Sequence, residues 1–208
     1  MRVAVLGASG RTGKEFINQA IHKGIELRAL VRSPEKILIA GNIQIIKGDA
    51  TDRSSIEQLL DGCDTVVSLL GHTKGSVSSM QAQALKHVID VMQTKGISRL
   101  IDLTGANVYF PSDKISLIDR CSTLLLKLFA PSRYADGVIH CSLIRQSNLE
   151  WTIVRAFLLT NGKLTRHYKS GNLKIGLLSC ISRADVAHYI IGLLEHGGMI
   201  KQAPRISY

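Results

Sequence analysis

Arg2-Val-Ala-Val-Leu6 is a short apolar segment that leads directly into Gly7-Ala-Ser-Gly-Arg-Thr-Gly13, a turn with three evenly spaced glycines. Apolar residues then recur at helical spacing from Phe16 to Ile21. Glycine permits the sharp bend and the close approach of a pyrophosphate, which rests on the free N–H groups and positive end of the new helix. The strand–turn–helix order predicts a dinucleotide site, and the alternative is an ordinary tight turn. The predicted phosphate-binding residues are Gly7, Ser9, Gly10, Arg11, Thr12 and Gly13.

The residue that follows the second predicted strand indicates which nucleotide binds. The apolar run 25–31 ends at Arg32, where an Asp or Glu would bind a free ribose 2′-hydroxyl and an arginine would meet a 2′-phosphate. Arg11 and Lys36 are further cations nearby, and Glu35 is less well placed to hold a ribose. The sequence therefore predicts NADP(H) in preference to NAD(H). The alternative is that these cations are simply solvated, since the whole chain is basic.

Strand and helix patterns alternate along most of the chain, which predicts an α/β fold of the Rossmann type. We expect a doubly wound parallel sheet with helices on both faces, in a single domain spanning residues 1–208. The further predicted strands are 43–47, 65–70, 100–103 and 151–154, and the further predicted helices are 52–61, 77–95, 134–147 and one that starts at Ser182. Ser182 and Asp185 fit a capping box.

Two stretches lack a clear periodicity of apolar residues, and we expect them to form loops on the substrate side. They are residues 107–133, which contain Pro111 and Pro131, and residues 157–181. We expect a short apolar helix near 121–130 in the first stretch and a strand at 173–178 in the second.

Composition narrows the class of protein. The chain has 208 residues, 45% of them hydrophobic, and a net charge of +10, which suits an anionic cofactor and an anionic substrate. Aromatic residues do not alternate with basic ones, so we expect no nucleic-acid partner. The four cysteines form no CxxC and no cluster with histidine, so we expect no metal. The longest apolar run, 124–130, is too short to span a bilayer. The expectation is a cytoplasmic monomer or homodimer with no membrane partner.

Ligands of an open parallel sheet bind beyond the carboxyl ends of its strands. The residues that follow the predicted strands are therefore candidates for the rest of the cofactor site. They are Asp49 and Ala50 beside the adenine, Leu70, Gly71 and His72 by the ribose, Thr104, Gly105 and Ala106 beneath the nicotinamide, and Arg155, Ala156 and Phe157 at the carboxamide end. Asp49 is equally explained as a turn former.

Catalytic side chains are sparse in this pattern. Thr104 and His72 are the candidates, although a histidine in a polar surface loop commonly has no catalytic role. The sequence has no Tyr-x-x-x-Lys pair, no Gly-x-Ser-x-Gly elbow and no paired carboxylate after a strand. Such a pattern favours chemistry in which the acceptor is itself a good electron sink and positioning does most of the work.

A planar, anionic acceptor would use the loop regions. The candidate contacts are Asn107, Phe110, Arg120, Phe157 and Arg166. The two phenylalanines could stack on a ring, and the two arginines, with Lys163 and Lys169, could hold phosphate or propionate groups. Core packing for the aromatic residues and solvation for the cations are the alternatives.

Several of these segments together resemble a known family. They are Gly7-Ala-Ser-Gly-Arg-Thr-Gly13, Leu30-Val-Arg32, Gly48-Asp49, Trp151-Thr-Ile-Val-Arg155 and Ile181-Ser-Arg-Ala-Asp-Val-Ala187. The chain resembles the atypical short-chain dehydrogenases with NAD(P)-binding, NmrA-like domains, and within them the biliverdin-IXβ reductase/flavin reductase group. The resemblance implies NADPH-dependent hydride transfer to flavins or linear tetrapyrroles in an open cleft. Two positions depart from that group: Gly105 replaces a common serine, and Ala156-Phe157 replaces a proline-and-histidine stretch.

Three functions follow from these observations. The preferred one is an NADPH-dependent reductase of a flavin or a biliverdin-like tetrapyrrole. The second is a non-catalytic NADP(H)-binding redox sensor that acts through a protein partner, since a sensor needs no acid or base. A sugar-nucleotide epimerase or dehydratase ranks last, because both its usual substrate lobe and its Tyr/Lys pair are missing.

Overall fold

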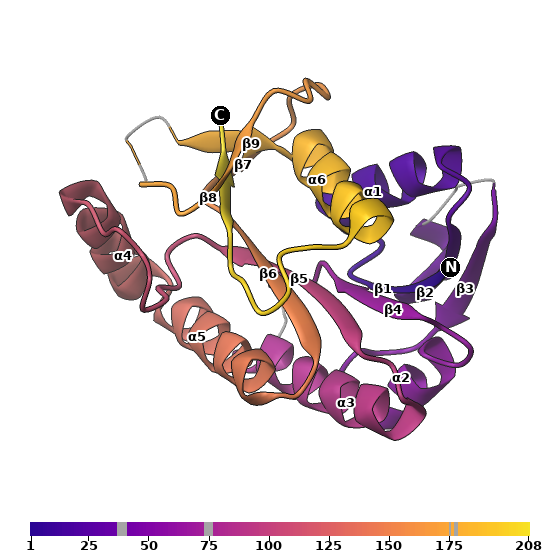
Figure 1. Cartoon of the computed structure of the whole chain (residues 1–208). Helices are drawn as coiled ribbons and strands as arrows, with labels where there is room; N and C mark the ends of the chain where they lie inside the picture. Colours follow the sequence, from indigo (N-terminus) through magenta and orange to yellow (C-terminus); the bar gives the residue numbers. More distant parts are fainter. Residues whose placement is uncertain (37–40, 73–76, 175, 177–178) are drawn as a thin grey trace.

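An eight-stranded sheet forms the centre of the structure, a computed structural model that describes all residues except 37–40, 73–76, 175 and 177–178 (Figure 1). The strands are β1 (Arg2–Leu6), β2 (Glu26–Val31), β3 (Ile43–Lys47), β4 (Thr65–Ser68), β5 (Arg99–Gly105), β6 (Glu150–Ala156), β7 (Leu158–Thr160), β8 (Lys169–Gly171), β9 (Cys180–Ser182) and β10 (Arg205–Ser207). The helices are α1 (Arg11–His22), α2 (Arg53–Leu59), α3 (Met80–Lys95), α4 (Leu117–Phe129), α5 (Pro131–Gln146) and α6 (Arg183–His196), with a short 3₁₀ turn at Pro34–Lys36.

The order of the strands places the expected cofactor site. Across the sheet the order is β3-β2-β1-β4-β5-β6-β10-β8, and all neighbours are parallel except β10 and β8. The chain winds outward in one direction from β1 to β3 and in the other from β4 onward, so the order reverses between β1 and β4. A crevice for ligands forms outside the carboxyl ends of the strands at such a reversal. The predicted doubly wound Rossmann-type architecture is confirmed.

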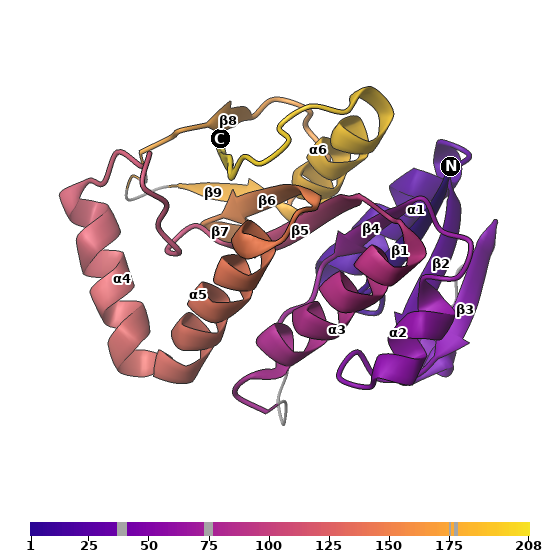
Figure 2. The same ribbon diagram turned by 60° about the horizontal axis from the view of Figure 1, so that its bottom comes forward.

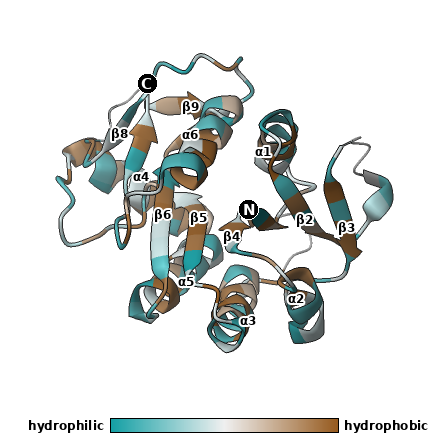
Figure 3. Cartoon of the chain, turned by 45° about the vertical axis from the view of Figure 1, so that its right-hand side comes forward, coloured by the Kyte–Doolittle hydropathy of each residue, from teal (hydrophilic) through white to brown (hydrophobic). Residues whose placement is uncertain are grey.

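Helices cover both faces of the sheet. Helices α1 and α6 pack together on one face, and α2, α3 and α5 lie side by side on the other (Figures 1 and 2). Each face has its own apolar core, built around Phe16 and Ile190 on the first and around Leu85 and Ile144 on the second. Strand β4, whose four residues are all buried, lies between the two cores, and Figure 3 shows both brown and teal turns on α2 and α3.

Four helices differ from their predicted bounds: those expected at 52–61 and 77–95 are shorter, spanning Arg53–Leu59 and Met80–Lys95, and two others begin earlier than expected. The apolar helix expected at 121–130 begins earlier, at Leu117, because the side chain of Ser116 accepts from the Asp119 N–H and the Asp119 carboxylate accepts from the Ser116 N–H. The helix expected at 134–147 begins at Pro131, which suits the first position of a helix because its missing N–H needs no partner there. Pro131 therefore starts a helix and does not mark a loop.

The edge of the sheet after β6 differs from the prediction. The strand expected at 173–178 does not form among its described residues. Short strands flank it instead: β8 pairs antiparallel with β10, and β9 pairs with β7 in a separate two-stranded sheet. Gly171 ends β8 with a positive φ of 127°, a conformation that L side chains rarely adopt. The sheet is thus parallel with one antiparallel edge strand.

The start of α6 is a partial capping box. The Ser182 hydroxyl accepts from the Asp185 N–H at 2.9 Å, as predicted. The Ser182 N–H donates to the Tyr208 hydroxyl, and the Asp185 carboxylate accepts from the hydroxyls of Ser182, Tyr208 and Thr165. Asp185 therefore joins the helix start to β10 and to the loop before β8.

A buried ion pair links α5 to the centre of the sheet. His140 Nε2 lies 3.1 Å from Asp102 Oδ2, and both side chains are almost fully enclosed. Burial alone would lower the pKa of His140, but the charge and hydrogen bond of Asp102 outweigh it and raise that pKa well above its usual value. Protonated His140 therefore stabilises the folded protein. This contribution is complete below the unfolded pKa of about 6.5 and is lost as pH rises through the raised pKa of the folded protein.

Asp102→Asn is expected to destabilise the protein most at acidic pH, because the buried imidazolium then has no counter-charge. Removing one partner of a buried pair typically costs about 3–5 kcal/mol. Urea unfolding from about pH 5.5 to about pH 9.5 should show the loss declining as the pH rises. Asp61→Asn, on an exposed pair with Lys95, is the control and should change stability little at any pH. An Asp102→Asn loss that stays constant over this range would contradict the assignment.

Candidate functional site: a dinucleotide crevice at the strand ends

Two glycines of the first turn are required by close backbone packing. Gly7 has a φ of +74°, and a Cβ there would meet the carbonyl oxygen of Leu69 at 2.3 Å. A Cβ on Gly13 would meet the carbonyl oxygen of Gly7, also at 2.3 Å. The turn after β1 is therefore pressed against the end of β4 on one side and against the first turn of α1 on the other.

The N-terminus of α1 is available to an anion. Gly10 is the N-cap, provides no side-chain cap, and no acidic residue lies in the first turn. A Cβ on Gly10 would come within 4 Å of one atom outside its immediate neighbours, the Gly7 oxygen at 3.1 Å. Ser9, Gly10 and Arg11 are exposed. Amide groups at such a helix end, with the dipole behind them, fit the pyrophosphate of a dinucleotide.

The two glycines should respond differently to substitution. Gly13→Ala is expected to lower the free energy of unfolding, because the backbone oxygens of Gly7 and Ala8 would have to move. Gly10→Val should leave the unfolding midpoint close to that of the wild type and weaken NADPH binding at least tenfold, since the added side chain would occupy the space of the pyrophosphate. Thermal melts and calorimetric titrations would measure both effects. Normal NADPH affinity in Gly10→Val would contradict the predicted site.

Charged side chains surround the expected adenosine end. Arg32, which follows β2, is exposed. Asp49, which follows β3, accepts from both the N–H and the hydroxyl of Thr51, and these bonds, with a smaller contribution from Arg32, lower its pKa. Asp49 thus forms the turn, as the alternative prediction has it, and the positive charge of Arg32 acts on it. Ala50 is half-buried beside it. The side chain of Lys36 lies outside the described part of the structure.

Arg183 begins α6, which packs against α1, and no sequence motif points to it. Burial and, to a smaller extent, the charge of Arg11 lower the pKa of Arg183, whose guanidinium donates to the Asn161 side chain at 2.7 Å. Each is the first residue of its helix, α1 or α6, where the helix dipole disfavours a positive charge. In the sequence, an arginine at the first position of a predicted helix is the feature that could indicate such a site. A bound phosphate would relieve both unfavourable interactions.

The ends of β4 and β5 form an open ledge. A Cβ on Gly71 or on Gly105 would meet no atom within 4 Å. Thr104 is half-buried between them and β6, while Ala106 is buried and donates its N–H to the Ala156 oxygen. Ala156 is also buried, and Phe157 is half-buried. The side-chain amide of Gln81 donates to the carbonyl of Leu70 and so fixes the β4 end of the ledge. The structure thus brings these expected cofactor residues together at the carboxyl ends of β4, β5 and β6.

His72 is held by a carboxylate. Its Nε2 lies 2.9 Å from Asp136 Oδ2 of α5, and its side chain is only 9% exposed. Asp136 also accepts from the N–H groups of Gln81 and Ala82, so it caps the start of α3. The ring of His72 is therefore enclosed and oriented by two helices, in place of the exposed loop position expected from the sequence.

Arg155, expected at the carboxamide end, has a structural role. Its guanidinium binds both oxygens of Asp113, at 2.6 and 2.7 Å, and donates to the carbonyls of Val108 and Ala203. Arg205 lies 3.2 Å from Asp119 and 3.5 Å from Asp113. All four charged side chains of this ion-pair cluster (Arg155, Arg205, Asp113 and Asp119) are at most 2% exposed. The side chain of Arg155 is thus occupied within the protein and does not extend toward a cofactor.

Two of the expected acceptor contacts are also used internally. Asn107 donates its amide to the hydroxyls of Ser122 and Thr123 and so attaches α4 to the end of β5. Phe110 is buried, with the guanidinium of Arg155 4.5 Å above its ring. The sequence places both residues in the correct loop but cannot show that their side chains point inward.

Arg120 and Arg166 remain available for an anionic acceptor. Both are exposed, Arg120 on α4 and Arg166 in the loop before β8. Arg166 has a φ of +61°, which is unfavourable for a side-chain-bearing residue, and its N–H donates to Asp185 at 2.7 Å. Strain of this kind, held in place by a buried carboxylate, is characteristic of functional loops.

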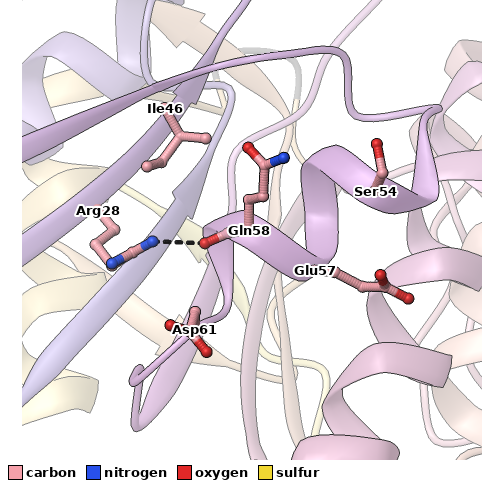
Figure 4. Close-up of a pocket in the computed structure, with 6 residues that line it drawn as sticks. All are labelled: Arg28, Ile46, Ser54, Glu57, Gln58 and Asp61. Carbon is pink, nitrogen blue, oxygen red and sulfur yellow. Dashed lines mark hydrogen bonds between the residues drawn. The ribbon is translucent and has the colours of Figure 1, made fainter.

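A surface hollow between β2, β3 and α2 is distinct from the crevice (Figure 4). Its central residue, Arg28, donates to the carbonyls of Leu59 and Gln58 and to the side chain of Gln44. Because Arg28 is occupied and Glu57 and Asp61 line the same hollow, it is not suited to an anionic ligand.

Among the described residues, no group of three or more His, Cys, Asp or Glu side chains is arranged to hold a metal ion. No helix found there is long and apolar enough to cross a bilayer.

Comparison with known proteins identifies the family. Residues 7–197 match the NAD(P)H-binding family, and the chain belongs to it. It is 26% identical to the uncharacterized protein YwnB of Bacillus subtilis, over 94% of this chain and 93% of that protein. The structure matches ChuY, an anaerobillin reductase from Escherichia coli O157:H7, with a TM-score of 0.83 and 20% identity over 100% of this chain and 97% of ChuY.

A second solved structure contains a nucleotide. A short-chain dehydrogenase/reductase from Veillonella parvula in complex with NADP matches with a TM-score of 0.79 and 16% identity, over 100% of this chain and 94% of that one. At these identities the two structural matches establish the fold. The chain therefore has the fold of NAD(P)H-binding oxidoreductases, with its candidate site at the strand ends.

Proposed function

We propose that the protein is an NADPH-dependent reductase whose acceptor is a flavin or a linear tetrapyrrole. The observation that carries the proposal is the open ledge of Gly71, Thr104 and Gly105 beside an uncapped helix start. The two glycines, with open space where a Cβ would stand, leave room for a planar ring against a planar nicotinamide. The anaerobillin reductase activity named for ChuY supports an acceptor of the tetrapyrrole class.

The choice of NADPH over NADH rests on the cations at the adenosine end. Arg32 is exposed at the end of β2, and neither it nor the adjoining Ser33 offers the carboxylate that would bind a free 2′-hydroxyl. Arg11, exposed at the first position of α1, adds positive charge at the same helix end. The Veillonella structure with NADP is consistent with this choice.

The residues of this chain would mainly bind NADPH and the acceptor and orient them toward each other. NADPH, when bound, supplies a hydride to the acceptor. The α1 amides and Arg32 hold its phosphates, and the backbone of residues 104–106 supports its reactive end. We expect the exposed Arg166, in the loop before β8, and Arg120, on α4, to attract anionic groups of the acceptor. His72, oriented by Asp136, is an enclosed imidazole beside the ledge, and we expect it to contribute position more than proton transfer.

Arg32→Ala should remove most of the preference for NADPH over NADH. A charge-assisted hydrogen bond to the 2′-phosphate is worth roughly 1.5–3 kcal/mol, so the wild type should bind NADPH at least about tenfold more tightly than NADH. Calorimetric titration with both nucleotides would measure the ratio. Arg53→Ala, which removes an exposed arginine on α2, should leave the ratio unchanged. Equal affinities of the wild type for the two nucleotides would contradict the proposal.

His72→Ala should lower the rate of flavin or biliverdin reduction by less than about 100-fold, the lower end of what general acid catalysis supplies. A conjugated acceptor spreads the incoming charge over its rings, and solvent can deliver the proton. The measurement is the loss of NADPH absorbance with FMN, FAD, riboflavin, biliverdin isomers and quinones, with His22→Ala as the control.

Two outcomes would change the assignment. A thousandfold loss in His72→Ala at unchanged NADPH affinity would make His72 the proton donor. Tight NADPH binding without turnover of any acceptor would favour the redox-sensor function.

A further inference from the structure

The outward face of α4 is apolar and uncovered. Leu117, Leu124, Leu128 and Phe129 are 59–83% exposed, and Leu125 is 55% exposed. At 100° per residue these side chains, with Ile118 and Cys121, share one side of the helix. The buried side chains of α4 are those of Asp119 and Thr123. The helix thus directs most of its hydrophobic side chains away from the protein.

The helix is nevertheless held firmly. Asp119 caps its start and pairs with Arg205, and the Tyr109 hydroxyl donates to the Asp119 carbonyl. Asn107 binds the hydroxyls of Ser122 and Thr123. Helix α4 packs against α5 and lies at the periphery of the molecule in both views (Figures 1 and 2). Polar contacts on its inner side therefore fix the orientation that exposes its apolar side.

The exposed charges around this face have one sign. Between residues 111 and 136 the three acidic side chains, Asp113, Asp119 and Asp136, are buried and paired. The charged residues exposed there are all basic: Lys114, Arg120, Lys127 and Arg133. Arg120 and Lys127 border one side of the apolar stripe on α4 itself. An apolar stripe bordered by cations and free of exposed anions is complementary to a surface that is apolar inside and negative outside.

We propose that α4 binds the surface of an anionic lipid bilayer. With 13 residues at 1.5 Å per residue, the helix is about 20 Å long, too short to span a membrane but suited to lie in its interface. A second copy of the chain is a poorer occupant, because pairing two identical faces would bring Arg120 and Lys127 toward their own copies. The proposal departs from the expectation, drawn from the sequence, of no membrane partner. It does not depend on the identity of the electron acceptor.

The test is flotation of the full chain with lipid vesicles. The protein should float with vesicles of phosphatidylcholine and phosphatidylglycerol at about 3:1 and not with pure phosphatidylcholine, and high salt should weaken binding. Leu124→Glu/Leu128→Glu should reduce the bound fraction more than tenfold. Arg120→Gln/Lys127→Gln should do the same, since each basic residue near the surface contributes about fivefold. The matched controls Ile200→Glu and Lys86→Gln/Lys47→Gln should stay within about twofold of the wild type.

A spectroscopic readout keeps the test independent of folding defects. Cys121 lies on the exposed face, whereas Cys63 and Cys141 are buried. In a Cys180→Ser background, an environment-sensitive fluorophore on Cys121 should shift to the blue with anionic vesicles alone, and thermal melts would confirm that each variant is folded. Equal flotation of wild type and α4 variants would overturn the proposal. So would a wild-type dimer that fails to float and that Leu124→Glu/Leu128→Glu splits into monomers.

Discussion

Two buried arginines hold the second half of the molecule together. Arg155 on β6 and Arg205 on β10 share Asp113, and Arg205 also contacts Asp119 at the start of α4. Removing four charges from water is unfavourable in free energy. Short ion-pair distances and hydrogen bonds to the carbonyls of Val108 and Ala203 offset this penalty. Replacing one member alone would leave a buried charge without its partner. The loop after β5, the start of α4 and the edge of the sheet are therefore fixed as one unit.

The crevice is bounded by two structural units with different physical origins. On the β1 side, backbone contacts of Gly7 and Gly13 leave no room for side chains and give a surface defined by peptide groups. On the β6 side, the ion-pair cluster holds the loop that would contact the acceptor. Asp136 connects the two units. It belongs to α5, the neighbour of α4, and it caps α3 and orients His72. Close backbone packing thus holds the cofactor side in place, and buried ion pairs hold the loop on the acceptor side.

The difference in origin explains what the sequence could predict. The glycine turn is mostly local: its three glycines lie within seven residues, so its strand, turn and helix follow from the pattern, although the contact of Gly7 with Leu69 does not. The role of Arg155 depends on Asp113, 42 positions away, and its position after a strand suggested a ligand contact instead. Likewise β8 and β10 have three residues each, too few to show a hydrophobic periodicity. They form because β10 pairs with β6 and β8 pairs with β10. Pro131 was ambiguous, since proline suits both a loop and the first turn of a helix.

The attachment of β8 has a consequence for the order of assembly. Strand β8 precedes β10 in the chain but joins the sheet only through it, so it has no partner until β10 has docked on β6. The loop that carries Arg166 ends at β8 and is tied to Asp185 of α6. Contacts between such distant segments form late and open first. Strand β8 and the loop that carries Arg166 should therefore fold late, and they can open locally while the ion-pair cluster and the nucleotide half keep their structure.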